Sequence, residues 1–503
     1  MGHKLTAGTD QHNLTPALSE TERAGVRFSP LLAGERVPAC GWWGEVSEDK
    51  INMKQVAAAA ITAALMITAT WSALSAPKIP AGKGAAAVIP VRLTSLGDNV
   101  KPFVAVRPSG GAYIAWAQKN GQKSAVLFAR ARDGAHLDSP VQVSMIGMHL
   151  DLGAESGPNV TVDGKGNIYV VWTAGSNAAP PTARAAGQKS GTGSHGAGAP
   201  PRPGNLNIWL ARSDDDGATF SLPARVNDDV DGPEHRFPTV AVDSHGGICV
   251  AWLDKRTKSA AGEDVARVFF ARSTDGGQTF GPNVDATSGQ PNPICHCCRV
   301  GVACDAGQGL LIAFRNDIDD LRDMFLIRTA DAGRSFSAPA PLEHTGWKLP
   351  NCPMDGPSIA VDTSGSVHAA WMSGANIPGI PAASKIQPDD SKVLYTTTAP
   401  GSTAARPPVV LGAGHHPRLA LSRAGDTFIT WHDRSICLAR IAKGGQEPAQ
   451  ILKLAGDKGA PSYPSIAAEP GGGVYCAWQQ LMPDDSVQIY LAHVPLAAFT
   501  QKP

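Results

Sequence analysis

The sequence predicts an all-β fold, a seven-bladed β-propeller, and three observations support this. A two-stranded hairpin that ends in Ala-Trp or a close variant recurs seven times. A second short turn sequence recurs three times, in phase with those hairpins. The composition agrees, since 54 glycines, 40 prolines and only 17% charged residues are typical of many short strands joined by tight turns.

Each hairpin repeat begins with a short apolar strand and ends on an aromatic residue. Most successive repeats lie 47 to 62 residues apart, near the length of a propeller blade. The seven units run from Phe103 to Trp116, Asn159 to Trp172, Thr239 to Trp252, Val300 to Phe314, Ser358 to Trp371, Arg418 to Trp431, and Ser465 to Trp478.

The second repeat has the form Ser/Thr-x-Asp-x-Gly-x-Thr/Ser-Phe. Its copies begin at Ser213, Ser273 and Thr329. In such a turn the Asp accepts hydrogen bonds from turn amides, the Gly adopts positive φ, and the Phe enters the core. The repeat resembles the Asp-box (BNR) repeat of sialidases over roughly residues 88–497. Sialidases have six blades, so a six-bladed ring is the alternative to the seven counted here.

The last repeat supplies three strands, because the chain after Trp478 offers only one more, at Gln488–Val494. The segment Val88–Thr94 precedes the first repeat and has the character of a strand. We predict that it completes the last blade and so closes the ring, which removes open sheet edges.

The N-terminal part predicts export. Residues 53–75 begin with Met53-Lys54, continue as an apolar run and end in small residues, as a secretory signal peptide does. A permanent membrane anchor is the alternative, because the run approaches spanning length. We expect residues 1–52 to be a non-native or disordered extension, 76–87 a linker, 88–497 the propeller, and the Ala/Pro/Gly/Ser-rich stretch 174–204 a disordered loop within it. The expected location is periplasmic or secreted, without stable membrane insertion after cleavage.

Charge argues against a nucleic-acid partner. Lys plus Arg and Asp plus Glu each number 44, so the formal net charge is zero, and there is no long basic run. We therefore expect a glycan or another small ligand as the partner.

Polar residues of unusual types gather where first strands begin and second strands end, which should be one axial end of a propeller. First-strand starts contribute His235, Arg236, Cys295, His296, Cys297, Cys298, Arg299, Cys352, His416, Arg418 and Tyr463; second-strand ends contribute Asp254, Arg256, Arg315, Asp317 and Asp433. Loop residues on a rigid scaffold favour function. Inter-blade ion pairs are the alternative for Asp254, Arg256, Asp317 and Asp433.

The resemblance to sialidases implies catalytic roles. His235-Arg236-Phe237-Pro238 is similar to the aromatic-Arg-Ile-Pro motif, whose Arg helps to clamp the sialic acid carboxylate. Arg299 and Arg418, at what we take for equivalent strand starts, would complete the clamp. Tyr463 stands where the nucleophilic Tyr would stand. The expected acid/base is Asp254; the carboxylate that would activate Tyr463 is not identifiable from the sequence.

The substrate-binding candidates are His235, Arg256, Arg315, Asp317, His416 and Asp433. No cofactor is expected on this interpretation.

The cysteine-rich segment supports a different interpretation. Cys295, His296, Cys297, Cys298 and Cys352 could bind copper or zinc or form a redox site. A structural disulfide from Cys297 or Cys298 to Cys352 is the other possibility. Cys249, Cys437 and Cys476 are expected to be buried core thiols. The Cys-x-Cys-Cys motif resembles that of bacterial exported propellers, which implies fold and location only.

A non-catalytic protein- or glycan-binding scaffold is the third alternative, since fold does not decide function. Trp347 lies outside the repeat and is the candidate for an exposed sugar-stacking residue.

Overall fold

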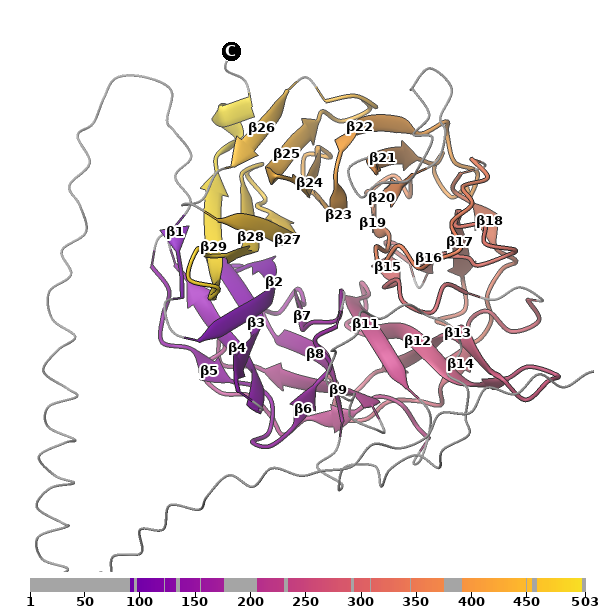
Figure 1. The fold of residues 1–503 in the computed structure, drawn as a ribbon, viewed down its shortest axis with the longest axis horizontal. Coiled ribbons are helices and arrows are strands. Elements are labelled where there is room, and N and C mark those ends of the chain that lie inside the picture. The colour runs from indigo at the N-terminus through magenta and orange to yellow at the C-terminus, as the bar shows by residue number, and fades with distance from the viewer. Residues whose placement is uncertain are drawn as a thin grey trace, which may run out of the picture. The chain divides into compact units, whose positions relative to one another are not determined.

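Seven antiparallel sheets are arranged as a ring around a central axis (Figure 1). The computed structural model describes residues 91–499 apart from 95–96, 122, 133–135, 154, 176–205, 230–233, 291–293, 308, 344, 375–390, 449 and 455–458. All of these belong to the unit Lys83–Pro503. The predicted extension 1–52, signal peptide 53–75 and linker 76–87 lie outside the described residues.

The strands of the first three blades follow chain order from the axis outward. They are β2 (Asp98–Val106), β3 (Ala112–Asn120), β4 (Lys123–Ala131) and β5 (Val141–Gln142); β6 (His149–Leu150), β7 (Asn159–Val162), β8 (Ile168–Gly175), β9 (Leu206–Ser213) and β10 (Ala224–Arg225); and β11 (His235–Val242), β12 (Ile248–Lys258), β13 (Asp264–Ser273) and β14 (Val284–Asp285). In the second blade β6 and β7 both pair with β8.

The remaining blades repeat this order. Their strands are β15 (Gly301–Cys304), β16 (Leu310–Arg315), β17 (Met324–Thr329) and β18 (Ala340–Pro341); β19 (Ser358–Val361), β20 (Val367–Ser373), β21 (Lys392–Thr397) and β22 (Val409–Ala413); β23 (His415–Leu421), β24 (Thr427–Asp433), β25 (Ser435–Ile441) and β26 (Ile451–Leu454); and β27 (Ala460–Ala468), β28 (Val474–Leu481) and β29 (Val487–Val494) with β1 (Val91–Arg92).

The N-terminal strand closes the ring, as predicted. β1 pairs antiparallel with β29, and the backbone amide of Leu93 donates to the Ile489 carbonyl at 2.8 Å. The amide of Ile489 in turn donates to the Thr94 hydroxyl at 2.9 Å. Seven sheets are therefore present rather than six, and the only helix among the described residues is the short 3-10 turn η2 (Leu496–Phe499).

The aromatic residue that ends each second strand lies between neighbouring sheets. Six of these residues are tryptophans with side chains that are almost fully buried: Trp116, Trp172, Trp252, Trp371, Trp431 and Trp478. Phe314 takes the place in the fourth blade and is also buried. A buried ring of this size contributes heavily to a core, so the repeat encodes the packing between blades.

The three Asp turns share one hydrogen-bond pattern. In the first, the Gly217 amide donates to the Ser213 hydroxyl at 2.9 Å, and the Thr219 amide donates to the Asp215 carboxylate at 2.9 Å. Gly217 has φ of 79°. Phe220 then packs edge-on against Phe128 of the preceding blade, with ring centroids 5.0 Å apart. These turns therefore fasten adjacent blades together.

Four inner strands, β2, β11, β23 and β27, carry a bulge near their start. In each bulge a non-glycine residue that precedes a proline adopts positive φ: Lys101 56°, Phe237 55°, His416 53° and Tyr463 49°. Bulges of this kind redirect side chains and commonly lie beside functional sites. They shape the axial ends of these strands.

Two predictions about exposure and order are corrected here. Trp347 is buried, with only 4% of its surface exposed, so it is no sugar-stacking platform. Ala174 and Gly175, expected to begin a loop, belong to β8; residues 176–204 lie outside the described residues. Cys249, Cys437 and Cys476 are buried, as predicted.

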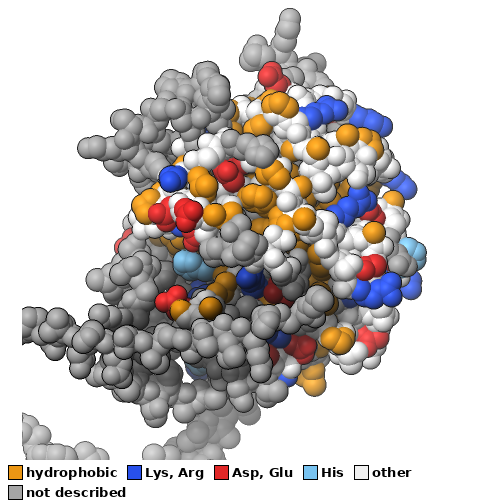
Figure 2. Space-filling model, turned by 90° about the vertical axis from the view of Figure 1, so that its right-hand side faces the viewer, with side chains coloured by type: hydrophobic (Ala, Val, Ile, Leu, Met, Phe, Trp, Pro, Cys, Tyr) orange, Lys and Arg blue, Asp and Glu red, His pale blue; other side chains and the backbone are white. Residues whose placement is uncertain are grey.

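The side of the ring that faces the viewer in Figure 2 mixes residue types. In Figure 2 basic and acidic side chains are interspersed among hydrophobic and other ones instead of being grouped by sign. This agrees with the zero formal net charge. No helix among the described residues is long and apolar enough to cross a membrane.

Candidate active site in an axial pocket

A small pocket, partly open to solvent, lies where four inner strands, β2, β7, β23 and β27, begin. Its walls come from the first, second, sixth and seventh blades, which are far apart in sequence. The lining residues are Lys101, Pro102, Phe103, Glu155, Gly157, Pro158, Asn159, Arg418, Tyr463 and Pro464. Arg418 and Tyr463 share the pocket, as the sequence predicted, and ring closure adds Glu155 and Lys101 of the first two blades, which the sequence had not indicated.

A buried ion pair crosses the ring below this pocket. The Arg299 Nε donates to a Glu155 carboxylate oxygen at 2.8 Å, and the other oxygen accepts from the Gly356 amide at 2.5 Å. Arg299 also donates to the carbonyls of Pro357 and Pro417. Both side chains are at most 4% exposed. Arg299 therefore connects its own fourth blade to the second, fifth and sixth, and its guanidinium is occupied by the protein itself.

Arg418 is the cation in the pocket wall that is available to bind a ligand. Its guanidinium lies over the Phe103 ring, 5.4 Å from the centroid. It makes no hydrogen bond or ion pair with any part of the chain that the structure describes. Burial, together with the nearby charge of Arg299, lowers the pKa of Arg418 to about 9, so it still carries a positive charge at neutral pH. A negatively charged ligand would relieve both effects.

Lys101 and Tyr463 form a second contact in the pocket wall. The Lys101 Nζ lies 2.9 Å from the centroid of the Tyr463 ring. Burial, with contributions from Glu155 and Asp355, raises the pKa of Tyr463 to about 12. Burial also holds the pKa of Lys101 well below its usual value. The phenol of Tyr463 is therefore protonated at neutral pH.

Behind Tyr463 lies a group of histidines with a buried carboxyl. The His416 ring packs 4.4 Å from Tyr463 and 5.2 Å from His432. The His416 amide donates to Asp355 at 2.6 Å. Burial first, and the charge of Glu155 second, raise the pKa of Asp355 to about 7. Burial, together with His415 and Lys101, lowers the pKa of His432 to about 4.

The three arginines of the predicted clamp occupy different positions along their strands. We take as the reference the first-strand residue that pairs with the residue just before the Trp or Phe on the second strand. This reference residue is Thr239 in β11, Gly301 in β15 and Arg418 in β23. Arg236 precedes this position by three residues and Arg299 by two. The equivalence that we inferred from the sequence is therefore wrong, because spacing within bulged strands hides the register.

Arg236 lies outside the pocket lining and is buried, with 6% of its surface exposed. Its Nε lies 3.6 Å from an Asp151 oxygen and 3.4 Å from a Glu234 oxygen. Neither Nε nor one terminal nitrogen has a hydrogen-bond partner in the described structure. Its assignment to a carboxylate clamp stays a prediction.

Asp254, expected as the acid/base, belongs to an ion-pair network. It is fully buried, accepts from Trp252 Nε1 at 2.9 Å and pairs with Arg256 at 2.8 Å. Arg256 also bridges to Asp228 and Asp229, while His235 Nε2 lies 3.3 Å from Asp254. None of the predicted trio His235, Asp254 and Arg256 lines the pocket. The alternative of structural ion pairs describes them better.

The other substrate-binding candidates also lie away from the pocket lining. Arg315 is 1% exposed and donates to the carbonyls of Arg322, Asp355 and Met372, so its donors are occupied. Asp317 pairs with Arg322 at 2.6 Å. Asp433 ends β24, half-buried. We assign none of these three a ligand contact.

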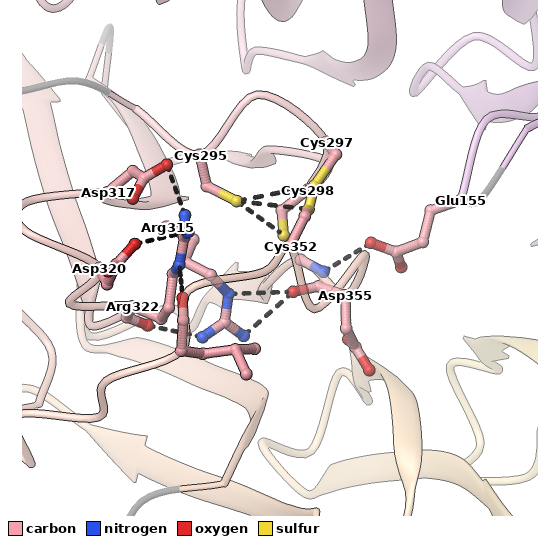
Figure 3. The surroundings of a disulfide bond; sticks show 12 residues. Glu155, Cys295, Cys297, Cys298, Arg315, Asp317, Asp320, Arg322, Cys352 and Asp355 are labelled. Carbon is pink, nitrogen blue, oxygen red and sulfur yellow. Dashed lines mark hydrogen bonds and ion pairs between the residues drawn. A yellow bond between two sulfur atoms is a disulfide. The ribbon is translucent and has the colours of Figure 1, made fainter. Parts of the chain in front are cut away.

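The four cysteines of the motif lie together next to this site (Figure 3). Cys297 and Cys352 form a disulfide, and Cys295 and Cys298 are free thiols. All four sulfur atoms lie within 4.8 Å of one another, but the exposed His296 is not among them. With two sulfurs bonded to each other, the set of thiolates that copper or zinc would need is incomplete.

Sequence reasoning missed Glu155 and Lys101, although one signal pointed to them. A residue-Pro pair opens the first strand in six of seven repeats, and Lys101-Pro102 and Gly157-Pro158 are two of them. Lys101 and Tyr463 share the position before this proline, and Glu155 stands two residues before Gly157. Aligning the repeats on the proline would have placed all three at the axis.

Known proteins resemble this chain in fold only. No protein-family model matches the sequence, and no curated protein matches it. Among solved structures, an ulvan lyase of polysaccharide lyase family 25 is 13% identical with a TM-score of 0.48, over 81% of this chain and 99% of that one. A Hadza microbial sialidase is 17% identical with a TM-score of 0.44, over 80% and 66%. The α-L-arabinofuranosidase Arb93A of Fusarium graminearum is 12% identical with a TM-score of 0.46, over 83% and 100%. At these identities the comparisons say nothing about the residues of the site.

Proposed function

We propose that the axial pocket binds a sugar residue that carries a carboxylate, and that the protein is an exported glycan-active propeller. The observation that carries this proposal is Arg418, a cation in the pocket wall that lies over the Phe103 ring but makes no hydrogen bond or ion pair within the described chain. The guanidinium of this half-buried side chain makes no hydrogen bond in the described chain, and a ligand carboxylate would supply a hydrogen-bonded counter-charge.

The pocket wall suits such a ligand in shape as well as charge. A guanidinium presents a planar fork that fits both oxygens of a carboxylate. Phe103, Tyr463 and the three prolines of the lining add apolar surface for the carbon face of a sugar ring.

Hydrolysis of the sialidase type is the reaction that this wall supports best. Tyr463 would act as the nucleophile. Because its pKa is raised to about 12, the phenol needs a base that accepts its proton during attack. Glu155 lines the same pocket, which supports it as the carboxylate that would activate Tyr463. Asp355 keeps a proton near neutral pH, as a general acid must, but it does not line the pocket, so we assign it no substrate contact.

A carboxylate-binding module without catalysis is the second candidate, and one observation favours it. Both Glu155 oxygens already accept hydrogen bonds, from Arg299 and from the Gly356 amide. A carboxylate satisfied in this way is a weak base. Binding through Arg418 does not depend on Glu155 accepting a proton.

Turnover of fluorogenic carboxylated glycosides, a sialoside and a glucuronide, tests the enzymatic proposal. The expected result is turnover by the wild type, its loss in Tyr463→Phe, and a fall in kcat/KM of about 30- to 150-fold in Arg418→Met, the equivalent of about 2–3 kcal/mol for a charged hydrogen bond. Arg440→Met is the matched control, because Arg440 pairs with Asp426 in the same blade outside the pocket lining.

The outcomes separate the two candidates. Absence of turnover, with Arg418-dependent binding of the free sugar acid in calorimetry, leaves the binding module. Binding or turnover that Arg418→Met does not change contradicts both. Export is proposed from residues 53–75, and N-terminal sequencing of protein from the periplasm or medium tests it.

A further inference from the structure

The four-cysteine cluster has a central atom, the sulfur of Cys295. It lies 3.4 Å from the Cys298 sulfur, 3.6 Å from the Cys352 sulfur and 3.8 Å from the Cys297 sulfur. A free thiol therefore lies close to both atoms of the disulfide and to a second free thiol. Figure 3 shows the three contacts converging on Cys295.

The two free thiols differ in their surroundings. The hydrogen bond from Cys298 lowers the pKa of Cys295 to about 7 in spite of burial, and the positive charges of Arg315 and Arg322 act in the same direction. Burial raises the pKa of Cys298 well above its usual value. Cys295 is thus the thiolate and nucleophile of the pair, and Cys298 holds the proton.

Exposure also differs among the four. Cys295, Cys297 and Cys298 are buried, at 0%, 8% and 2% exposed, whereas Cys352 is half-buried at the start of the fifth blade. Only Cys352 is accessible enough to meet a reagent from solution. Any change of disulfide partner that frees the Cys352 thiol would thus make it reactive toward a thiol reagent in solution.

We propose that the cluster is an internal thiol–disulfide exchange centre. The Cys295 thiolate attacks the Cys352 sulfur, a bond forms between them, the Cys297–Cys352 bond breaks, and Cys297 leaves as a thiolate. Cys298 gives its proton to Cys297 and attacks Cys295, which forms Cys295–Cys298 and releases Cys352 as a thiolate that takes up a proton. One disulfide and two thiols are present before and after, so no outside oxidant or reductant is needed.

The reaction replaces a long-range disulfide with a local one. Cys297–Cys352 spans 55 residues and joins the entrance of the fourth blade to that of the fifth, whereas Cys295–Cys298 lies within one loop. Residues shortly after Cys352 hold parts of the axial site: the Asp355 carbonyl accepts from Arg315, and the Gly356 amide donates to Glu155. The exchange therefore loosens the segment that orients Glu155. The centre itself does not depend on the proposed function.

Alkylation of the native protein tests this directly. The wild type is treated with iodoacetamide at pH 8, quenched in acid, digested without reductant and mapped by mass spectrometry. The expected result is label accumulating on Cys352 together with a Cys295–Cys298 disulfide. At pH 5 the labelling slows by about tenfold or more, because fewer thiols are ionised.

Variants assign the steps. Cys295→Ser leaves Cys352 unlabelled, because the first attack is lost. Cys298→Ser stops after the first step, so Cys352 stays unlabelled and the map shows a Cys295–Cys352 disulfide in place of Cys297–Cys352. Cys437→Ser, at a buried thiol outside the cluster, labels Cys352 as the wild type does. The wild-type map needs no variant and stands even where a variant fails to fold.

Three results would overturn the proposal. One is a wild type in which Cys297–Cys352 stays intact and any label lies on Cys295 or Cys298. The second is a cluster with two disulfides and no reactive thiol. The third is a cluster of four thiols that react only after a chelator removes bound zinc or copper, which would identify a metal site in its place.

Discussion

Replacing Arg299 by methionine removes the cation that faces Glu155 inside the ring. Glu155 would keep its burial and its hydrogen bond from the Gly356 amide but lose the guanidinium that donates to its other oxygen. Breaking a buried ion pair from one side costs about 3–5 kcal/mol. Two backbone carbonyls would also lose their donor, so we expect a value toward the upper end of that range.

The assay is urea unfolding followed by tryptophan fluorescence at pH 7, since six of the seven blades have a buried tryptophan in the repeat position. The double variant Arg299→Met/Glu155→Gln should regain at least about 2 kcal/mol, because no unpaired charge remains. Arg212→Met is the control: Arg212 pairs with the mostly exposed Asp214, so the loss should stay below about 1 kcal/mol.

A loss in Arg299→Met no larger than in Arg212→Met would refute this reasoning. It would mean that Glu155 gains no stability from Arg299, and that the cross-ring pair does not organise the axial site. A double variant as unstable as the single one would refute the charge as the cause and leave packing instead.

The remaining predictions concern pH, backbone strain and ring closure. The pKa of His432 is about 4 in the folded protein, so as pH falls from 6.5 to 4 this histidine is protonated in the unfolded chain before the folded one. The free energy of unfolding of the wild type should therefore fall by up to about 3 kcal/mol over this window because of His432. In His432→Asn this part of the pH dependence should be absent from urea unfolding measured at each pH. Gly333→Ala should cost about 1–3 kcal/mol more than Gly110→Ala, because both have φ near +90° but only at Gly333 does a Cβ meet the Phe270 ring; equal losses would contradict this. Leu93→Pro should speed amide hydrogen exchange in β29 by removing the donor to Ile489, and unchanged exchange there would argue against closure by β1.

Much of the fold could be predicted because it is encoded in short repeats. A tryptophan at the end of a second strand and a Phe after an Asp turn both fill space between blades, so their spacing reveals the blade count. The closing strand could be predicted from the missing fourth strand of the last repeat. These features depend on contacts within one repeat or between neighbours.

The site could be predicted only in outline. That Arg418 and Tyr463 share one axial end follows from strand direction. The ion pair between Arg299 and Glu155 could not be predicted from strand direction, because the partners are 144 residues apart in different blades. The bulges also shift the register by amounts that spacing does not show, which is why Arg236, Arg299 and Arg418 seemed equivalent. Asp254 seemed catalytic because its partners Arg256 and His235 could equally have faced solvent.

A crystal structure of the wild type soaked with N-acetylneuraminic acid or glucuronic acid tests the central claim most directly. We expect electron density for the sugar in the axial pocket, with its carboxylate against the Arg418 guanidinium and its ring near Tyr463. Density for the ligand only elsewhere on the molecule, or an axial ligand whose carboxylate points away from Arg418, would contradict it.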